Sequence, residues 1–344
     1  MGHIMNVLVT GGAGFIGSNF VRYALKQHPN WQITTLDALT YAGRRETLHD
    51  VIEHPRHTFV HGNITDAGVV DPLVQNANIV IHFAAETHVD RSIKSAESFI
   101  QTDVIGTFVL LEAARRNTTL LQRFVQISTD EVYGSVEVGK SRETDALMPR
   151  NPYAASKAAA DRLAYSYWAT YGVPVIVTRA SNNYGPYQFP EKLIPLFITN
   201  AIKGEAVPLY GDGLNVRDWL HVEDHCRAID VLLGAGTNGE IYNIGGGNEV
   251  TNLDLTLRIL AVLKVPPTMI HPVTDRLGHD RRYALNTRKL RSLGWRPHIE
   301  ISTALEETVD WYRENEWWWR PLTTTKIRPR GQLTEQQIKR LEDW

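Results

Sequence analysis

The sequence has almost no cysteine and no excess of either charge. Cys226 is the only cysteine among 344 residues, so neither an intrachain disulfide nor a zinc site of several thiolates can form. This use of cysteine is typical of a reducing compartment, and we expect a cytoplasmic protein. Lys and Arg number 36 against 38 Asp and Glu, a net charge of −2. Domains that bind nucleic-acid phosphates usually carry a basic excess, so nucleic acid is not an expected partner.

Long hydrophobic runs are also missing. No segment approaches the roughly 20 apolar residues that cross a bilayer, because charged or amide side chains interrupt every candidate. The first residues, MGHIMNVLVTGG, lack the cationic and apolar regions of a signal peptide, and we expect a soluble protein without a membrane partner. Apolar residues make up 43% of the chain and charged residues 22%, a composition that supports a sizeable folded core.

Short β-branched runs alternate with longer amphipathic segments in the first half of the chain, which predicts βαβ units and a parallel sheet. The expected strands are Asn6–Thr10, Gln32–Asp37, His57–His61, Asn78–Phe83, Arg123–Ser128 and Pro174–Arg179. Two long helices are expected at Ala96–Arg116 and Pro152–Tyr171, where apolar residues recur at helical spacing. The predicted fold class is therefore α/β, with a Rossmann-type doubly wound parallel sheet.

After the sixth predicted strand the rhythm loosens, and Gly and Pro become frequent. We expect residues 5–181 to form the dinucleotide-binding domain and residues 182–316 a smaller, partly interleaved α/β substrate domain. The segments 218–221 and 240–244 are expected to be strands that return to the first domain. Residues 320–344 are expected to form a peripheral tail.

A G-x-x-G-x-x-G run lies between the first predicted strand and a helix, formed by Gly11, Gly14 and Gly17. Glycines at these places allow a tight turn and a close approach of the backbone to a pyrophosphate, whose charge meets free N–H groups at the helix start. Asp37 lies twenty residues further on, where a carboxylate binds ribose hydroxyls and repels a 2′-phosphate. The pattern favours NAD over NADP, although Arg44 and Arg45 leave that choice open. A glycine turn without a ligand is the weaker interpretation.

Tyr153 and Lys157 are four residues apart on a predicted helix, so their side chains share one face. A nearby ammonium group and a positively charged nicotinamide would both favour the phenolate, which makes Tyr153 a candidate general base for an alcohol proton. Taken alone, such a pair is more often an exposed, solvated one. Its position after a dinucleotide fingerprint reverses that preference.

Three further candidates, Thr129, Asp130 and Glu131, end the fifth predicted strand, at the sheet edge where open α/β proteins bind ligands. Sugar oxidation or epimerisation needs only a hydroxyl group and the Tyr/Lys pair. Two adjacent carboxyl groups indicate an additional elimination, with one as the base and the other, held protonated, as the acid. The alternative is that the two carboxyl groups cap a following turn.

Together these motifs resemble the extended short-chain dehydrogenase/reductases, and among them most of all the dTDP-glucose 4,6-dehydratase family. The resemblance covers about residues 6–316, and the Thr-Asp-Glu triplet before Tyr-x-x-x-Lys is its most specific part. The segments that carry it are Thr10–Gly17, Ala84–Ser92, Ser128–Gly134, Tyr153–Lys157 and Ser181–Pro195.

The resemblance implies a lyase reaction with recycled NAD. Tyr153, assisted by Lys157 and Thr129, would deprotonate the sugar 4-hydroxyl as hydride passes from C4 to tightly bound NAD. Glu131 would then remove the C5 proton while Asp130 protonates the C6 hydroxyl, which leaves as water. Hydride finally returns to C6 and a proton is restored at C5, so that the cofactor is regenerated in each turnover.

The resemblance also implies which residues surround the ligands. On the cofactor side they are the three glycines, Asp37, Phe15, Ile16, Ala38, Thr40, Asn63, Ile64, Ala84, Ala85, Thr102, Tyr153, Lys157 and Asn183. On the nucleotide-sugar side they are Thr87, Asn182, Lys192, Leu193, Pro208, Tyr210, Arg217, Asn252, Asp275, Arg276 and His279. Lys192 and Arg217 carry the charge that suits a diphosphate.

The sequence departs from the family pattern at four places. Asn63 stands where the family usually has an adenine-binding Asp, and Ala38 where a Lys is common. Asp103 replaces a usual Asn, and Leu277 replaces a Pro. None of these is among the five catalytic candidates, but they leave the details of adenine binding and the nucleotide preference open.

Other functions also stay open at this stage. They are a 4,6-dehydratase for a UDP-, CDP- or GDP-linked sugar, a nucleotide-sugar 4-epimerase, and a non-catalytic NAD sensor. His221 and His225 have the spacing of helical metal ligands, but no third ligand is evident and no metal is expected. The two long predicted helices resemble the pair that forms a dimer interface in this superfamily, which implies a homodimer.

Overall fold

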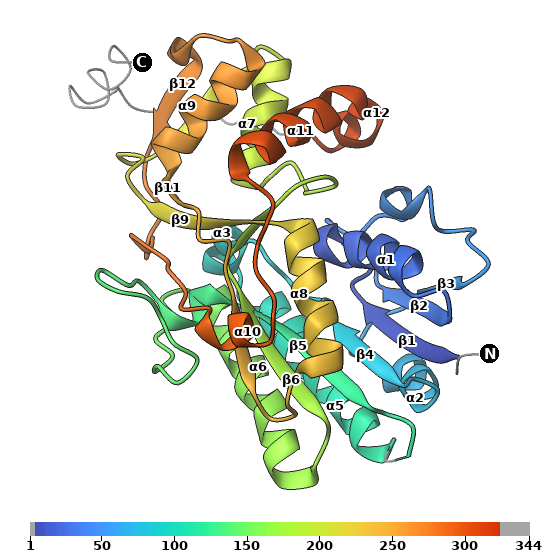
Figure 1. Cartoon of the computed structure of the whole chain (residues 1–344). Helices are drawn as coiled ribbons and strands as arrows, with labels where there is room; N and C mark the ends of the chain where they lie inside the picture. Colours follow the sequence, from blue (N-terminus) through green and yellow to red (C-terminus); the bar gives the residue numbers. More distant parts are fainter. Residues whose placement is uncertain (1–3, 118, 324–344) are drawn as a thin grey trace.

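The computed structural model describes residues 4–117 and 119–323, and its centre is a parallel seven-stranded sheet (Figure 1). The strand order is β10-β6-β5-β4-β1-β2-β3. The strands are β1 Met5–Thr10, β2 Trp31–Asp37, β3 His57–His61, β4 Ile79–His82, β5 Arg123–Thr129, β6 Val175–Ala180 and β10 Ile241–Ile244. Each of the six strands expected in the first half of the chain is present within a residue of its predicted ends, and all pairs in this sheet are parallel.

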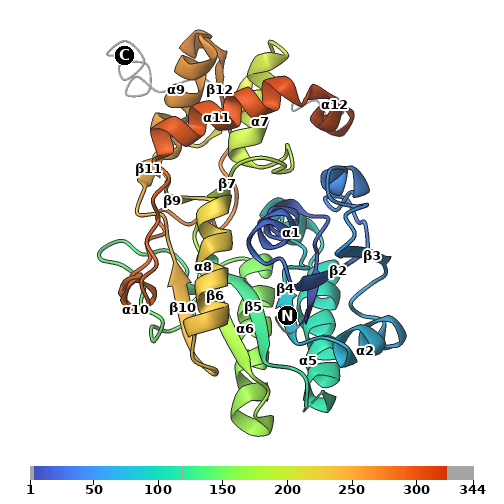
Figure 2. The same cartoon turned by 45° about the vertical axis from the view of Figure 1, so that its right-hand side comes forward.

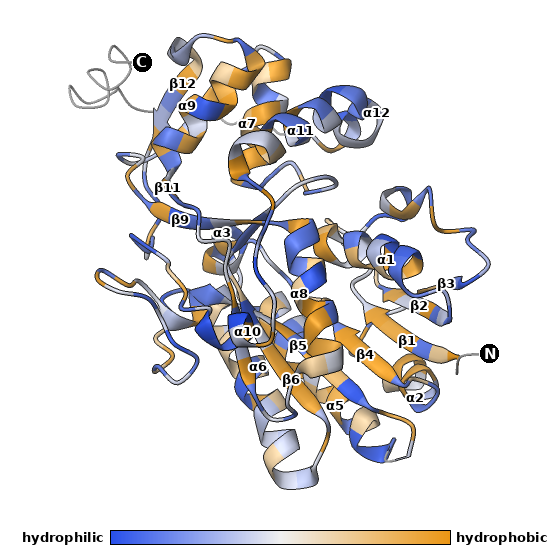
Figure 3. Cartoon of the chain, viewed as in Figure 1, coloured by the Kyte–Doolittle hydropathy of each residue, from blue (hydrophilic) through white to orange (hydrophobic). Residues whose placement is uncertain are grey.

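Helices cover both faces of this sheet (Figure 2). The helices α1 (Phe15–Gln27) and α8 (Val222–Ala235) pack on one face, and α2 (Ala67–Gln75), α5 (Thr107–Arg116) and α6 (Pro152–Tyr171) on the other. Side chains of β1 alternate between the two layers: Val7 and Val9 join the cluster with α1 and α8, and Leu8 joins the opposite cluster. Because both faces are buried, the strands are almost continuously hydrophobic, as Figure 3 shows for β1 and β4.

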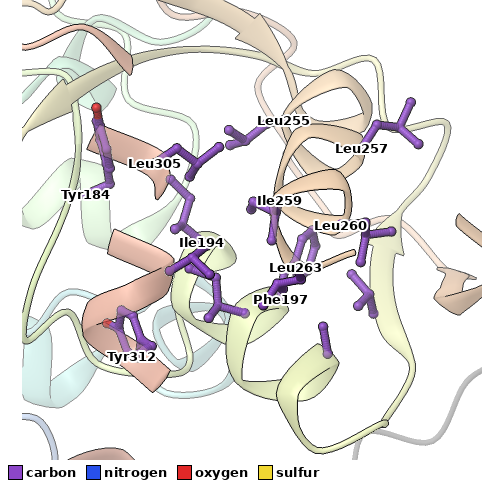
Figure 4. Packing of buried hydrophobic residues seen from close by; sticks show 14 of the residues in the cluster. Tyr184, Ile194, Phe197, Leu255, Leu257, Ile259, Leu260, Leu263, Leu305 and Tyr312 are labelled. Atoms are coloured by element: carbon purple, nitrogen blue, oxygen red, sulfur yellow. The ribbon is translucent and has the colours of Figure 1, made fainter. Parts of the chain in front are cut away.

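A second unit lies beyond the carboxyl ends of these strands. It contains a three-stranded sheet and a two-stranded parallel sheet, built from β7 Asn182–Tyr184, β8 Val207–Tyr210, β9 Val216–His221, β11 Glu249–Thr251 and β12 Ile270–Val273. Its helices are α7 Leu193–Ile202, α9 Asn252–Leu263, α11 Ile301–Glu314 and α12 Glu316–Trp319. Between them lies a separate hydrophobic core, in which Phe197, Leu260 and Tyr312 are fully buried (Figure 4).

The two units are interleaved in the sequence. The strand expected at 240–244 is β10, which pairs with β6 at the edge of the large sheet. The expectation that the segment 218–221 also returns to that sheet is wrong, because its strand β9 pairs with β7 and β11 in the second unit. The edge of β6 is already occupied by β10, so no pairing position is left there for β9.

Both long predicted helices are present. Helix α6 has the predicted bounds, with Asn151 Oδ1 accepting a hydrogen bond from Ala154 N at 2.8 Å and Gly172 ending the helix in a left-handed conformation. The helix expected at 96–116 is helical without interruption over residues 97–116, but α4 (Glu97–Phe99) and α5 are joined by a π-helical segment η2 (Ile100–Gly106) that the sequence did not predict. Gly106 lies close to Ile64, since a Cβ at this position would lie 2.4 Å from Ile64 Cδ1.

The remaining elements are short. They are η1 Arg45–Leu48, α3 Val89–Lys94, η3 Asp130–Tyr133, η4 Pro267–Met269, α10 Arg288–Ser292 and η5 Arg320–Leu322. Residues 324–344 of the expected tail lie outside the described residues. Among the helices of the described ranges, none has the length and apolar character required to cross a membrane.

Candidate active site

Two adjoining cavities lie where the carboxyl ends of the large sheet meet the second unit. The first has a volume of about 300 Å³ and the second about 590 Å³. They share several lining residues, among them Glu131, Asn182 and Lys192. The carboxyl edge of an open α/β sheet is where such folds bind their ligands, so the two cavities form one candidate site.

The glycine turn forms the floor of the first cavity. Gly11 has a φ of +69°, and a Cβ at this position would lie 2.6 Å from the backbone nitrogen of Ala84. Helix α1 then begins at Phe15, and no side chain caps its first N–H groups. Those N–H groups and the positive end of the helix dipole face the turn, which fits the charge of a pyrophosphate.

Asp37 ends β2 beside this turn. Its buried carboxylate accepts hydrogen bonds from Ala13 N at 2.9 Å and Leu39 N at 2.8 Å, which fixes the turn against β2. Burial raises the pKa of Asp37, and these two bonds oppose the rise. Each carboxylate oxygen keeps a second lone pair for a ribose hydroxyl.

Every residue expected on the cofactor side lines the first cavity. The glycine cradle, the carboxylate and these walls together fit a bound dinucleotide. Tyr41, Glu86, Phe189 and His225 also line this cavity, although the sequence did not identify them as site residues. Glu86 belongs to the Ala84–Ser92 run, so that run carried a signal for it.

Tyr153 and Lys157 are buried on α6, so the interpretation as a solvated surface pair is wrong. Lys157 Nζ donates a hydrogen bond to Ile127 O at 2.7 Å, which holds the ammonium group against β5. Burial raises the pKa of Tyr153 well above its ordinary value, and the charge of Glu131 raises it further. The protein alone thus raises the pKa of Tyr153, whereas a lowering was expected from Lys157 and a bound nicotinamide together.

The Thr-Asp-Glu triplet follows β5 directly. Thr129 Oγ1 accepts a hydrogen bond from Glu131 N at 3.3 Å and so caps the turn η3 itself. The two carboxyl groups do not cap the turn, which overturns that alternative. Asp130 is 3% exposed, and its Oδ2 is buried without a hydrogen-bond partner among the described residues. Both carboxyl groups line the first cavity.

The two carboxyl groups differ in their electrostatic surroundings. Burial, and next the charge of Glu131, raise the pKa of Asp130 well above its ordinary value. Burial also raises the pKa of Glu131, but the cations Arg217, Lys192 and Arg276 oppose that rise. Asp130 is thus the better proton donor of the pair, and Glu131 the better base.

The second cavity has cationic and aromatic walls. Arg217 Nη2 donates to Asp280 O at 2.9 Å, and the Arg217 guanidinium lies 4.3 Å from the centre of the Tyr283 ring. Lys192 Nζ donates a hydrogen bond to the backbone oxygen of Thr87. Both residues line both cavities, so this bond lies where the two cavities meet. The expected residues that line one or both cavities here are Thr87, Asn182, Lys192, Leu193, Tyr210, Arg217, Asn252, Arg276 and His279.

Two expected substrate residues line neither cavity. Pro208 is buried in β8, where it is paired with His271 of β12. Asp275 Oδ1 accepts a hydrogen bond from His279 Nδ1 at 2.6 Å, so Asp275 positions the His279 ring. Tyr283 does line the second cavity, and no motif in the sequence pointed to it.

The two histidines considered as metal ligands have other contacts. His221 Nδ1 accepts a hydrogen bond from Glu223 N at the start of α8. His225 is buried, its Nδ1 lies 2.9 Å from Asn183 Oδ1, and burial lowers its pKa to about 3. Within the described ranges, no group of three or more His, Cys, Asp or Glu residues is arranged to hold a metal ion.

The comparisons with known proteins agree with this geometry. The sequence profile of the family described as GDP-mannose 4,6 dehydratase matches residues 8–308. The chain belongs to this family. It is 54% identical over 333 residues to a dTDP-glucose 4,6-dehydratase of Streptomyces antibioticus, a match that covers 95% of this chain and 97% of that protein. The resemblance recognised from the sequence motifs is thereby confirmed.

Solved structures of related enzymes share the fold. DesIV, a dTDP-glucose 4,6-dehydratase from Streptomyces venezuelae crystallised with NAD, has a TM-score of 0.91 and 51% identity, over 93% of this chain and all of that one. A UDP-glucose 4-epimerase from Thermus thermophilus in complex with NAD has a TM-score of 0.83 and 31% identity, over 90% of this chain and 99% of that one. Dehydratases and epimerases therefore share this Rossmann-type fold, and the side chains of the site must decide between them.

Proposed function

We propose that the chain is an NAD-dependent dTDP-glucose 4,6-dehydratase that forms dTDP-4-keto-6-deoxyglucose. One observation carries the proposal: Asp130 and Glu131, two carboxyl groups in different electrostatic surroundings, line the same cavity as Tyr153 and Lys157. Oxidation alone, or epimerisation at C4, has no use for such a pair. Elimination of water needs one group to take a proton and another to give one.

The residues divide the work as follows. Bound NAD would supply the redox chemistry, by which hydride leaves the sugar C4 and later returns to C6, and a proton restored at C5 completes the product. Tyr153 takes the proton of the 4-hydroxyl, while Thr129 and Lys157 orient and polarise the groups at that position. Glu131 removes the C5 proton, which the neighbouring ketone has made acidic. Asp130, held protonated by burial, gives its proton to the C6 hydroxyl, which leaves as water.

The cavity walls support a nucleotide diphosphate sugar as the substrate. Lys192, Arg217 and Arg276 bring three positive charges to the second cavity, next to the carboxyl pair. They are the groups proposed to bind the diphosphate, because cationic side chains form charge-assisted hydrogen bonds with phosphate oxygens. We assign residues 5–181 mainly to NAD binding and residues 182–316 mainly to the sugar nucleotide.

Two further proposals concern the whole protein. A homodimer is supported by exposed apolar side chains on neighbouring elements at one side of α6, among them Ile100, Ile105 and Phe108. A cytoplasmic location is supported by Cys226, a buried thiol in a chain without a second cysteine.

Incubation of the purified protein with dTDP-glucose, without added reductant, tests the proposed reaction. We expect mass spectrometry to show the loss of one water from dTDP-glucose, and parallel samples with UDP-, GDP- and CDP-linked sugars test the base preference. Dehydration of a different nucleotide sugar would keep the mechanism and replace the substrate. Inversion at C4 without loss of water would establish an epimerase instead.

A further inference from the structure

Asp103 is a buried acid that the mechanism above does not use. It lies in the π-helical segment η2, it is 1% exposed, and it lines neither of the two cavities. The segment η2 packs against α6, the helix that carries Tyr153 and Lys157. A buried carboxyl group is costly unless it is neutral or well bonded, so its hydrogen bonds indicate its state.

The Asp103 carboxyl group has two hydrogen-bond partners, one of which is shared with the backbone of Tyr153. Oδ1 accepts a bond from Glu86 N at 2.8 Å. Oδ2 lies 2.6 Å from Ser156 Oγ, and that hydroxyl also lies 2.8 Å from Tyr153 O. A hydroxyl group has one proton and can donate it to only one acceptor. When Asp103 is ionised, the Ser156 hydroxyl donates to Oδ2 and its contact with Tyr153 O is not a hydrogen bond; when Asp103 is protonated, it donates to Ser156, which can then donate to Tyr153 O.

The charged neighbours of Asp103 belong to the catalytic machinery. From α6, Lys157 favours the ionised form of Asp103, and from the loop after β4, Glu86 disfavours it. Burial is the largest influence and raises the pKa of Asp103 to about 6. The group thus changes charge within the pH range in which enzymes are usually assayed.

The influence also runs in the other direction. Burial lowers the pKa of Lys157, and a negative charge on Asp103 opposes that fall, as does Asp161. The same charge adds to the effects of burial, Glu131 and Asp130, which raise the pKa of Tyr153. His82 is a further titratable neighbour of Lys157. Burial lowers the pKa of its ring to about 3, so the ring is neutral.

We propose that Asp103 is a titratable positioning residue whose charge sets the pH range in which the Tyr153–Lys157 pair works. This inference rests on the proposed function, in which Tyr153 is the base for the sugar hydroxyl. At low pH, Asp103 is neutral and no longer raises the pKa of Lys157 or of Tyr153, which favours the phenolate of Tyr153. At higher pH, Asp103 is ionised, and its negative charge helps to keep Lys157 protonated. The same charge raises the pKa of Tyr153, so that its phenolate is a stronger base but forms only at higher pH.

The substitution Asp103→Asn tests this directly. An amide repeats the bonds of the protonated acid, since its oxygen accepts from Glu86 N and its nitrogen donates to Ser156 Oγ, but it never ionises. Removal of a negative charge lowers the pKa of both neighbours, so we expect both limbs of the kcat–pH profile to move to lower pH, by up to about one unit. Because the groups interact, the limbs report the pair rather than single residues.

Two further variants serve as a control and as an independent test. Glu97→Gln removes the same charge from the exposed neighbouring helix α4, and its profile should coincide with that of the unmodified protein. Ser156→Ala keeps Asp103 but removes a bond that favours its ionised form, so a smaller shift in the same direction is expected. If Asp103→Asn does not fold, the Ser156→Ala profile decides the question.

A lower kcat at every pH with unmoved limbs would show that Asp103 is only structural. If the substrate is a different nucleotide sugar, the proposed function is wrong. The role of Asp103 is then tested by the same pH profiles, measured with that sugar. An infrared difference spectrum between the unmodified protein and Asp103→Asn gives a readout without turnover. It should show the band of a protonated carboxyl group that disappears as the pH rises through about 6, and a band absent at all pH values would overturn the proposal.

Discussion

At the scale of single residues, the site separates two chemically similar carboxyl groups. Asp130 and Glu131 are adjacent in one turn, and their order in the sequence does not say which is the acid. Arg217 lowers the pKa of both groups. The difference comes from the charges of Glu131 and Asp218, which raise the pKa of Asp130, and from Lys192 and Arg276, which oppose the rise at Glu131 and lie far along the chain. The spacing of the residues predicted the presence of both roles and the family resemblance implied which residue has which, and the folded arrangement gives a physical reason for that assignment.

The substitution Glu131→Gln should stop elimination without emptying the cofactor site. The amide keeps the shape of the side chain but cannot take the C5 proton, so we expect dehydration of dTDP-glucose to fall by a factor of about 10² to 10⁴. Bound NAD, measured after denaturation of the purified variant, should stay at the level of the unmodified protein.

Glu137→Gln is the matched control for this prediction. Glu137 is exposed a few residues further on, so the same change of charge there should leave the rate unaltered. Undiminished product formation by Glu131→Gln would remove Glu131 from the role of base.

At the scale of secondary structure, local sequence patterns predicted what depends on local interactions. The strands of the large sheet follow from β-branched runs, and α6 follows from its cap and its spacing. The π-helical turn between α4 and α5 was not predicted, because the spacing of apolar residues there is also compatible with a regular α-helix. The placement of β9 was missed because it depends on contacts between distant parts of the chain, such as the pairing of β10 with the edge of β6.

The turn between β1 and α1 gives a prediction about cofactor binding. Gly11→Ala would place a Cβ 2.6 Å from the backbone of Ala84, in addition to the cost of a positive φ. The turn must then shift, and we expect the purified variant to contain little or no NAD.

Gly204→Ala is the control that measures only the free-energy cost of placing alanine at a positive φ. Gly204 has a φ of +70°, nearly that of Gly11, but a Cβ there meets nothing within 4 Å. This variant should lose only about 1 to 2 kcal/mol of unfolding free energy and keep its NAD. Equal NAD content in the two alanine variants would contradict the role of the close approach to Ala84.

Helix α6 is tied to β6 by a buried ion pair, Arg179 with Asp161 at 2.7 Å. Arg179→Met would leave the Asp161 carboxylate buried without its main partner, so we expect the unfolding free energy to fall by about 3 to 5 kcal/mol in a urea titration. Arg162 also contacts Asp161, at 3.2 Å, but its side chain is 45% exposed. Arg162→Met should therefore cost less than about 1 kcal/mol, and similar losses in the two variants would contradict this account.

At the scale of the whole molecule, apolar side chains stay exposed on adjoining elements. Ile93 lies on α3, Ile100 and Ile105 on the π-helical segment, and Phe108 on α5, each between 37% and 45% exposed. These elements border α6, whose Tyr165 is also partly exposed. Apolar residues gathered in this way commonly mark an interface between proteins.

The proposed homodimer can be measured directly. Light scattering at micromolar concentration should give the mass of two chains, and Phe108→Glu should shift it toward one chain, because a charge would be buried in the interface without a partner. Val138 offers a control, since it is 91% exposed on a loop outside these elements. Val138→Glu should keep the mass of two chains, whereas a single-chain mass for the unmodified protein would overturn the proposed homodimer.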